Sequence, residues 1–95
     1  MTVEEMKEMF RSEIGEWPSF ACQVYKPHPR PDISAMITLD RLSPGSGRIV
    51  SAAEHDEIWF DAEIESVAAN ATPADIKLLA ACRVRLDGDS FAMYV

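Results

Sequence analysis

The side chains best suited to chemistry lie in one short stretch, residues 54–65, whose sequence is EHDEIWFDAEIE. Six of the sixteen acidic residues of the chain fall in this stretch, which contains no Lys or Arg and a single histidine, His55. Carboxylates beside an imidazole could ligate a divalent cation, transfer a proton, or present a negative surface to a basic partner. The segment therefore poses three alternatives: a metal site, a catalytic site and a binding surface.

A cation site centred on His55 is the weaker of the two binding interpretations. Asp56 and Glu57 beside it, and Asp61 further along, supply oxygen ligands. Their spacing, however, lacks the glycine and the regularly placed carboxylates of an EF-hand loop, and also the paired histidines of a zinc-protease helix. We therefore expect no metal and no cofactor, and we keep a divalent-cation or small-ligand site at His55 as the alternative.

A catalytic role for His55 requires a nucleophile or a phosphate-binding loop, and the sequence has the pattern of neither. Ser51, Ser66 and Ser90 lack the flanking glycines of a nucleophile elbow. The glycine-containing loop before the segment lacks the Lys and Ser/Thr of a P-loop. Cys22 and Cys82 form neither a zinc motif nor a CxxC motif, so we expect free, buried thiols, with a disulfide between them as the alternative. The sequence thus favours a protein that is not an enzyme and has no catalytic residues.

The third interpretation is a surface that binds another protein. Uncompensated carboxylates create a local negative field, and tryptophan is a frequent anchor of protein interfaces. Such a surface suits a protein partner with a basic surface, for example a nucleic-acid-binding host factor. A second alternative is a structural protein without a dedicated site, in which the acids only keep a strand edge from pairing. The residues predicted to bind the partner are Glu54, His55, Asp56, Glu57, Trp59, Asp61 and Glu63.

Length and composition limit the other functions of the chain. Its 95 residues, 47% hydrophobic and 26% charged, fit one globular domain over residues 1–95. A net charge of −7 argues against direct binding of nucleic acid or of an anionic membrane. No apolar run approaches the roughly 18 residues of a spanning helix, and the first residues are acidic, so we expect a cytoplasmic protein. A domain this short is marginal by burial alone, so homodimerisation would be unsurprising.

Helices are predicted where a start signal precedes an apolar repeat. Thr2 and Glu5 form a capping-box pattern before the first repeat, and Thr72 with Pro73 starts the last one. Residues 32–42 fit a helical face and an alternating strand equally well, and we favour the helix. The other predicted helices cover residues 3–14, 62–69 and 73–82.

Strands are predicted where apolar and polar residues alternate. Two short strands flank the acidic tip, over residues 48–51 and 58–60, and Gly88 marks the turn of a β-hairpin that ends the chain. Residues 20–25 alternate as well, but Pro18 makes an edge strand or an extended segment equally consistent with the pattern. A proline at every second position makes residues 26–31 a stiff, proline-rich connector.

Together these elements predict an α+β fold. It is a single small domain of three to four short helices packed on a small antiparallel sheet that ends in the C-terminal β-hairpin. Its core should be formed by Val3, Met6, Phe10, Ile58, Phe60, Ile76, Leu79, Val84, Leu86, Phe91 and Met93.

The C-terminal half of the chain resembles small phage and prophage proteins that share the pattern EHDxIW…CxVRxDxDSFxMYV. The residues that carry this resemblance are Glu54, His55, Asp56, Ile58, Trp59, Cys82, Val84, Asp87, Asp89, Ser90, Phe91 and Met93. Those proteins have no established activity, so the resemblance brings no catalytic residue. It implies an accessory protein of a mobile element, a setting in which small acidic proteins commonly bind host or phage machinery.

Overall fold

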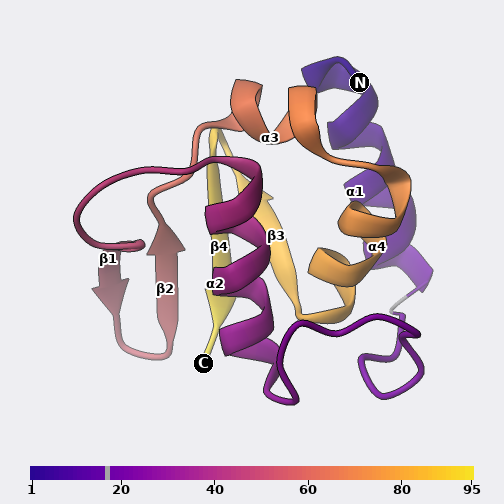
Figure 1. The fold of residues 1–95 in the computed structure, drawn as a ribbon, viewed down its shortest axis with the longest axis horizontal. Coiled ribbons are helices and arrows are strands. Elements are labelled where there is room, and N and C mark those ends of the chain that lie inside the picture. The colour runs from indigo at the N-terminus through magenta and orange to yellow at the C-terminus, as the bar shows by residue number, and fades with distance from the viewer. Residues whose placement is uncertain (17) are drawn as a thin grey trace.

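Helices and strands alternate in pairs along the computed structural model, which describes residues 1–16 and 18–95 (Figure 1). The bounds in the described chain are α1 Val3–Glu16, α2 Pro31–Leu42, β1 Val50–Glu54, β2 Glu57–Phe60, α3 Ile64–Asn70, α4 Pro73–Ala81, β3 Val84–Asp87 and β4 Ser90–Tyr94. The predicted α+β class, with its terminal hairpin, is confirmed. Within these residues no helix is both long enough and apolar enough to cross a membrane.

The four strands form one antiparallel sheet in the order β1-β2-β4-β3, so two hairpins join along β2 and β4. In this register Ile58 lies opposite Met93, and Phe60 lies opposite Phe91. Because side chains alternate along a strand, these residues share one face with Val84 and Leu86 of β3. We call this the core face, and the opposite side of the sheet the outer face.

The helices bury the core face. The ring of Phe10 from α1 lies 6.0 Å from that of Phe91, measured between centroids. Eight of the predicted core residues are buried, whereas Val3, Ile58 and Leu86 pack partly exposed around them. The buried eight are Met6, Phe10, Phe60, Ile76, Leu79, Val84, Phe91 and Met93.

Helix α2 resolves the ambiguous stretch in favour of a helix, but on an unexpected face. The apolar residues that fit one helical face are Ile33, Met36 and Ile37, yet Ile37 is 42% exposed. The buried side instead combines Ala35 and Leu39 with the small polar residues Ser34 and Thr38. Pro31 lies in the first turn of α2, where its missing N–H is not needed, so the connector ends one residue earlier than predicted.

The segment over residues 20–25 is not a strand. Its backbone forms local turns instead, in which the Cys22 N–H donates to Ser19 O and the Gln23 N–H donates to Phe20 O. Val24 is fully exposed, so the alternating pattern buries no face against a sheet. Cys22 is exposed as well, which corrects the expectation of two buried thiols, whereas Cys82 is buried and both are free.

Candidate functional site

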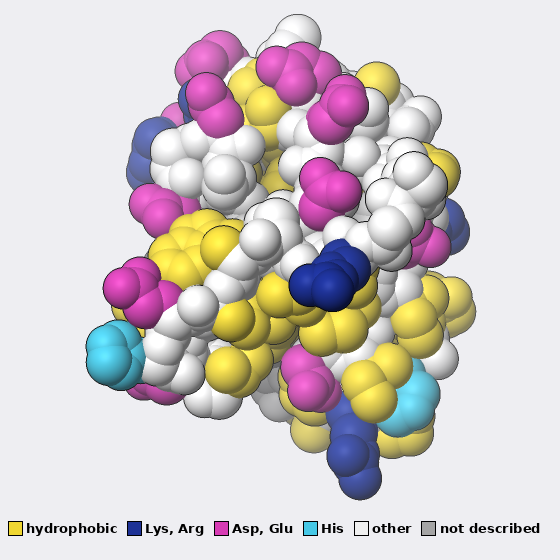
Figure 2. Space-filling model, turned by 90° about the vertical axis from the view of Figure 1, so that its left-hand side faces the viewer, with side chains coloured by type: hydrophobic (Ala, Val, Ile, Leu, Met, Phe, Trp, Pro, Cys, Tyr) yellow, Lys and Arg dark blue, Asp and Glu magenta, His cyan; other side chains and the backbone are white. Residues whose placement is uncertain are grey.

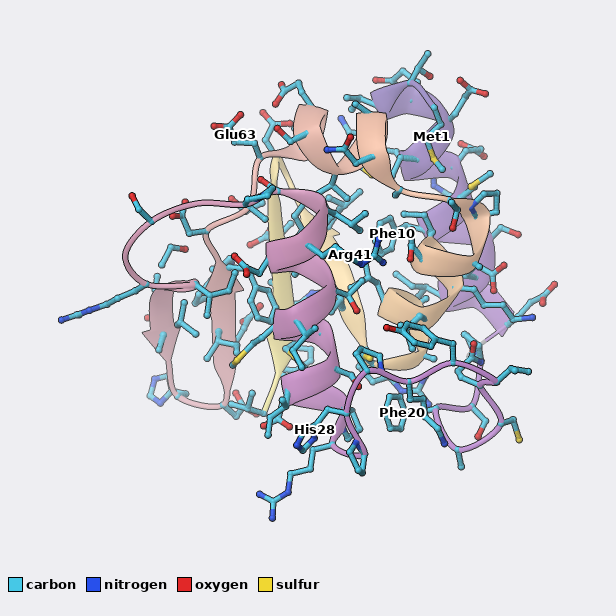
Figure 3. All side chains as sticks on the ribbon, viewed as in Figure 1. Met1, Phe10, Phe20, His28, Arg41 and Glu63 are labelled. Carbon is cyan, nitrogen blue, oxygen red and sulfur yellow. The ribbon has the colours of Figure 1, made fainter. Side chains whose placement is uncertain are left out.

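The hairpin of β1 and β2 divides the acidic segment between two ends of the molecule. His55 and Asp56 form its two-residue turn, and Glu54 lies opposite Glu57 at the start of the ladder. Strand β2 then runs roughly 13 Å from the turn before Asp61 and Glu63 follow. Glu63 lies at the end of the molecule where α3 begins, away from the turn (Figures 1 and 3). The structure therefore does not gather the predicted residues on one surface.

The turn end carries exposed charge on a fixed backbone. Glu54, His55 and Asp56 are all exposed. His55 has a φ of 52°, in the left-handed region, and the backbone carbonyl of Asp56 accepts a hydrogen bond from the Val95 N–H at 2.6 Å. Within the described part of the chain, Glu54 and Asp56 form no ion pair. Two carboxylates at this end are thus free to meet a cation.

Glu57 differs from its neighbours because it already has a cationic partner. Its carboxylate pairs with the guanidinium of Arg85, which reaches across β4 from β3. The same guanidinium lies over the ring of Tyr94, with its central carbon 4.3 Å from the ring centroid. Both members of the ion pair are only partly exposed. Glu57 therefore holds an arginine in place on the outer face.

Trp59 also lies on the outer face and, like Glu57, reaches a partner on β3. Its indole Nε1 donates a hydrogen bond of 2.9 Å to Asp87 Oδ2 on β3. Ala92 of β4 lies opposite Trp59 on one side and Arg85 on the other, and it is fully buried although it points outward. The bond to Asp87 carries the indole from β2 across β4 to β3.

The outer face therefore combines two aromatic side chains, Trp59 and Tyr94, with more acidic than basic residues. Its strand residues are Ala52, Glu54, Glu57, Trp59, Arg85, Asp87, Ser90, Ala92 and Tyr94. Three of these are acidic and one is basic, and the turns at either end add Asp56 and Asp89. Asp89 lies 4.0 Å from Lys7 Nζ. Tyr94 is 58% exposed, so aromatic surface remains open to solvent.

Asp61 and Glu63 have local structural roles away from this surface. The Asp61 N–H donates to the Ile49 carbonyl at 2.6 Å, which closes the far end of the β1–β2 hairpin. The Glu63 N–H donates to Ser43 Oγ at 2.9 Å and precedes α3 as its N-cap residue, without a side-chain cap. These two carboxylates provide a natural internal comparison for the pair at the turn.

The cation alternative at His55 gains no support from the geometry. Over residues 1–16 and 18–95, no three His, Cys, Asp or Glu side chains come together in a group that could hold a metal ion. His55 projects from the turn, with only exposed neighbours in sequence. The buried thiol of Cys82 is neutral, because burial raises its pKa to about 12.

Arg85, Asp87 and Tyr94 belong to this surface but were not among the residues predicted to bind a partner. The sequence did contain a signal for their orientation, because all three alternate with core residues in the terminal hairpin and must point away from the core. Which strand of that hairpin pairs with β2 was not encoded in any local pattern. The contacts of Glu57 and Trp59 depend on that pairing.

Comparison with known proteins adds no family assignment: no family model, no curated protein and no solved structure matches this chain.

Proposed function

We propose that this protein is not an enzyme and acts by stoichiometric binding of a protein partner with a basic surface, through the outer face of its sheet. The observation that supports this proposal most strongly is the placement of Trp59 and Tyr94. Both side chains lie on the outer face, opposite the face that the helices bury, where Trp59 bonds to Asp87 and Tyr94 lies opposite Glu57. Aromatic surface bordered by charge of one sign is typical of protein interfaces.

The chemistry of the face fits lysine or arginine side chains. Arg85 already shows how the face accommodates a guanidinium, which pairs with Glu57 and stacks on Tyr94. An incoming basic segment would find Glu54 and Asp56 unpaired, and its aliphatic stems would pack beside the indole of Trp59. Because these acids are exposed, they would act mainly on the association rate and the salt dependence of binding.

The resemblance of the C-terminal half to small phage and prophage proteins supports this proposal by association. In that setting the partner would be a protein of the host or of the phage, and a nucleic-acid-binding factor is the kind of protein whose surface is basic. The surface would then present carboxylates where such a factor normally meets phosphates.

A paired charge reversal tests the proposal. The variant Glu54→Lys/Asp56→Lys reverses the two free carboxylates at the turn, and Glu57 is left in place because it holds Arg85. The matched control Asp61→Lys/Glu63→Lys changes the net charge equally at the other end of the same segment. Binding of a fluorescent Lys- and Arg-rich peptide is followed by anisotropy at physiological salt.

We expect the turn variant to bind about tenfold or more weakly than wild type, because two close charge interactions become repulsive. The control should lose only the long-range part of the attraction, which salt screens. Equal losses in the two variants would show that the peptide responds to net charge alone. That result, or unchanged binding by the turn variant, would overturn the proposal.

A further inference from the structure

The two edge strands of the sheet differ in how far other elements protect them from pairing with a further strand. The edge strand β3 contacts α1 and α4. The other edge strand, β1, has its main contacts with β2, and every residue from Ser51 to Glu54 is exposed. A free edge strand presents unpaired N–H and C=O groups to which another strand can add. Strand β1 lies on the left of Figure 1, and Figure 2 views the molecule from that side.

The side chains of β1 do little to block pairing. Ser51, Ala52 and Ala53 are small and uncharged, and no Lys or Pro interrupts the strand. A register irregularity lies between Val50 and Ala52, and the ladder is regular from Ala52 to the turn. Along an antiparallel strand, the backbone N–H and C=O groups of successive residues point alternately to the two sides of the strand. Glu54 flanks the two-residue turn, so its backbone groups point to β2. The N–H and C=O of Ala53 therefore point to the free edge.

The charges at the two ends of β1 identify what would fit beside it. Arg48 precedes the strand, is exposed and forms no ion pair with any described residue. Glu54 and Asp56 lie at the other end, also unpaired. An antiparallel copy of the same strand would bring Arg48 beside the acidic end of its partner, twice in a symmetric pair. A parallel copy would place like charges together.

We propose that β1 is a dimerisation edge that pairs antiparallel with β1 of a second copy of this chain. The sheet would then run through eight strands, and the two outer faces would lie on one side of it. The interface is small and polar, so the dimer should form reversibly, in the micromolar range or above. This inference does not depend on the proposed binding of a basic partner, and it is tested without one.

Sedimentation equilibrium of the purified full chain, from micromolar to millimolar concentration, is the test. Arg48→Glu should weaken dimerisation by about tenfold or more, since two attractive contacts become repulsive. Glu54→Lys/Asp56→Lys should weaken it similarly. The triple variant with all three changes should recover affinity, because the ends of the strand are complementary again. Arg30→Glu, the same change at an exposed site on the N-terminal side of α2, should leave dimerisation unaltered.

Recovery of dimerisation in the triple variant would show that the other variants lose affinity through strand pairing and not through unfolding. Arg48 lies at the opposite end of β1 from Glu54 and Asp56, so a recovery must occur between two chains. Three results would each overturn the inference: a wild-type chain that stays monomeric at all concentrations, a dimerisation affinity unchanged by Arg48→Glu, or a triple variant that does not recover that affinity. Far-UV circular dichroism of every variant verifies that the fold is retained.

Discussion

The start of α4 gives the sharpest prediction for stability, because Asp75 makes several interactions there. Its Oδ2 accepts hydrogen bonds from the Thr72 N–H at 2.9 Å and from the Thr72 hydroxyl at 3.1 Å, which completes the capping box. Its Oδ1 accepts a hydrogen bond of 2.6 Å from Arg41 Nη2 on α2. Asp75 thus caps one helix and ties it to another.

The replacement Asp75→Ala removes all of these interactions together. A lost cap costs about 1 kcal/mol, and a partly exposed ion pair adds about 0.5 kcal/mol. We therefore expect the free energy of unfolding to fall by about 1.5 kcal/mol near pH 7, from the sum of these contributions. Urea unfolding followed by far-UV circular dichroism measures this difference, and Asp40→Ala on the exposed side of α2 is the control.

The size of this difference should depend on pH. Burial by itself would raise the pKa of Asp75, but the hydrogen bonds from Thr72 and Arg41 outweigh burial and lower the pKa overall. A lowered pKa means that the folded state favours the carboxylate. The stabilisation is therefore present above the unfolded pKa of about 3.9 and is lost as pH falls through the folded pKa.

The difference in the free energy of unfolding between wild type and Asp75→Ala should therefore become smaller as the pH falls below about 4. A difference in unfolding free energy that stays constant at acidic pH would refute the assignment of the stabilisation to the carboxylate. A gap near pH 7 no larger than that of Asp40→Ala would refute the capping argument itself.

Two further substitutions test the packing and the turn. Thr38 is buried, and its hydroxyl has no hydrogen-bond partner among the described residues, so Thr38→Val should raise the free energy of unfolding by about 1 kcal/mol, whereas Thr38→Ser should lower it. A Val variant no more stable than wild type in urea would contradict this account. His55 has a φ of 52°, so His55→Gly should raise the melting temperature, in line with a gain of about 0.5 kcal/mol, and His55→Val should lower it. A less stable glycine variant would show that the turn is not strained.

Local signals in the sequence were sufficient for most elements. The capping box at Thr2 and the helix start at Thr72 form as predicted, because each depends on residues only a few positions apart. The terminal hairpin follows for the same reason. Helix α2 was harder, because its buried face includes Ser34 and Thr38, which no hydrophobic pattern marks as core.

The candidate site was less predictable than the fold. Sequence proximity suggested one acidic surface, but a strand points successive side chains to opposite faces and carries its ends apart. Glu57 and Trp59 find their partners on β3, nearly thirty residues later in the chain. Such contacts depend on how two hairpins pair, and that is decided by the burial of the whole core face rather than by neighbouring residues.

A nitrogen-15 NMR titration with a Lys- and Arg-rich peptide shows, residue by residue, whether the outer face of the sheet binds a basic partner. The indole N–H of Trp59 and the backbone amides of Glu54 and Tyr94 report on that face, whereas those of Asp61 and Glu63 report on the other end of the acidic segment. We expect the outer-face resonances to shift most, and Glu54→Lys/Asp56→Lys to suppress these shifts. Shifts centred on Asp61 and Glu63, or spread evenly over the surface, would contradict this expectation.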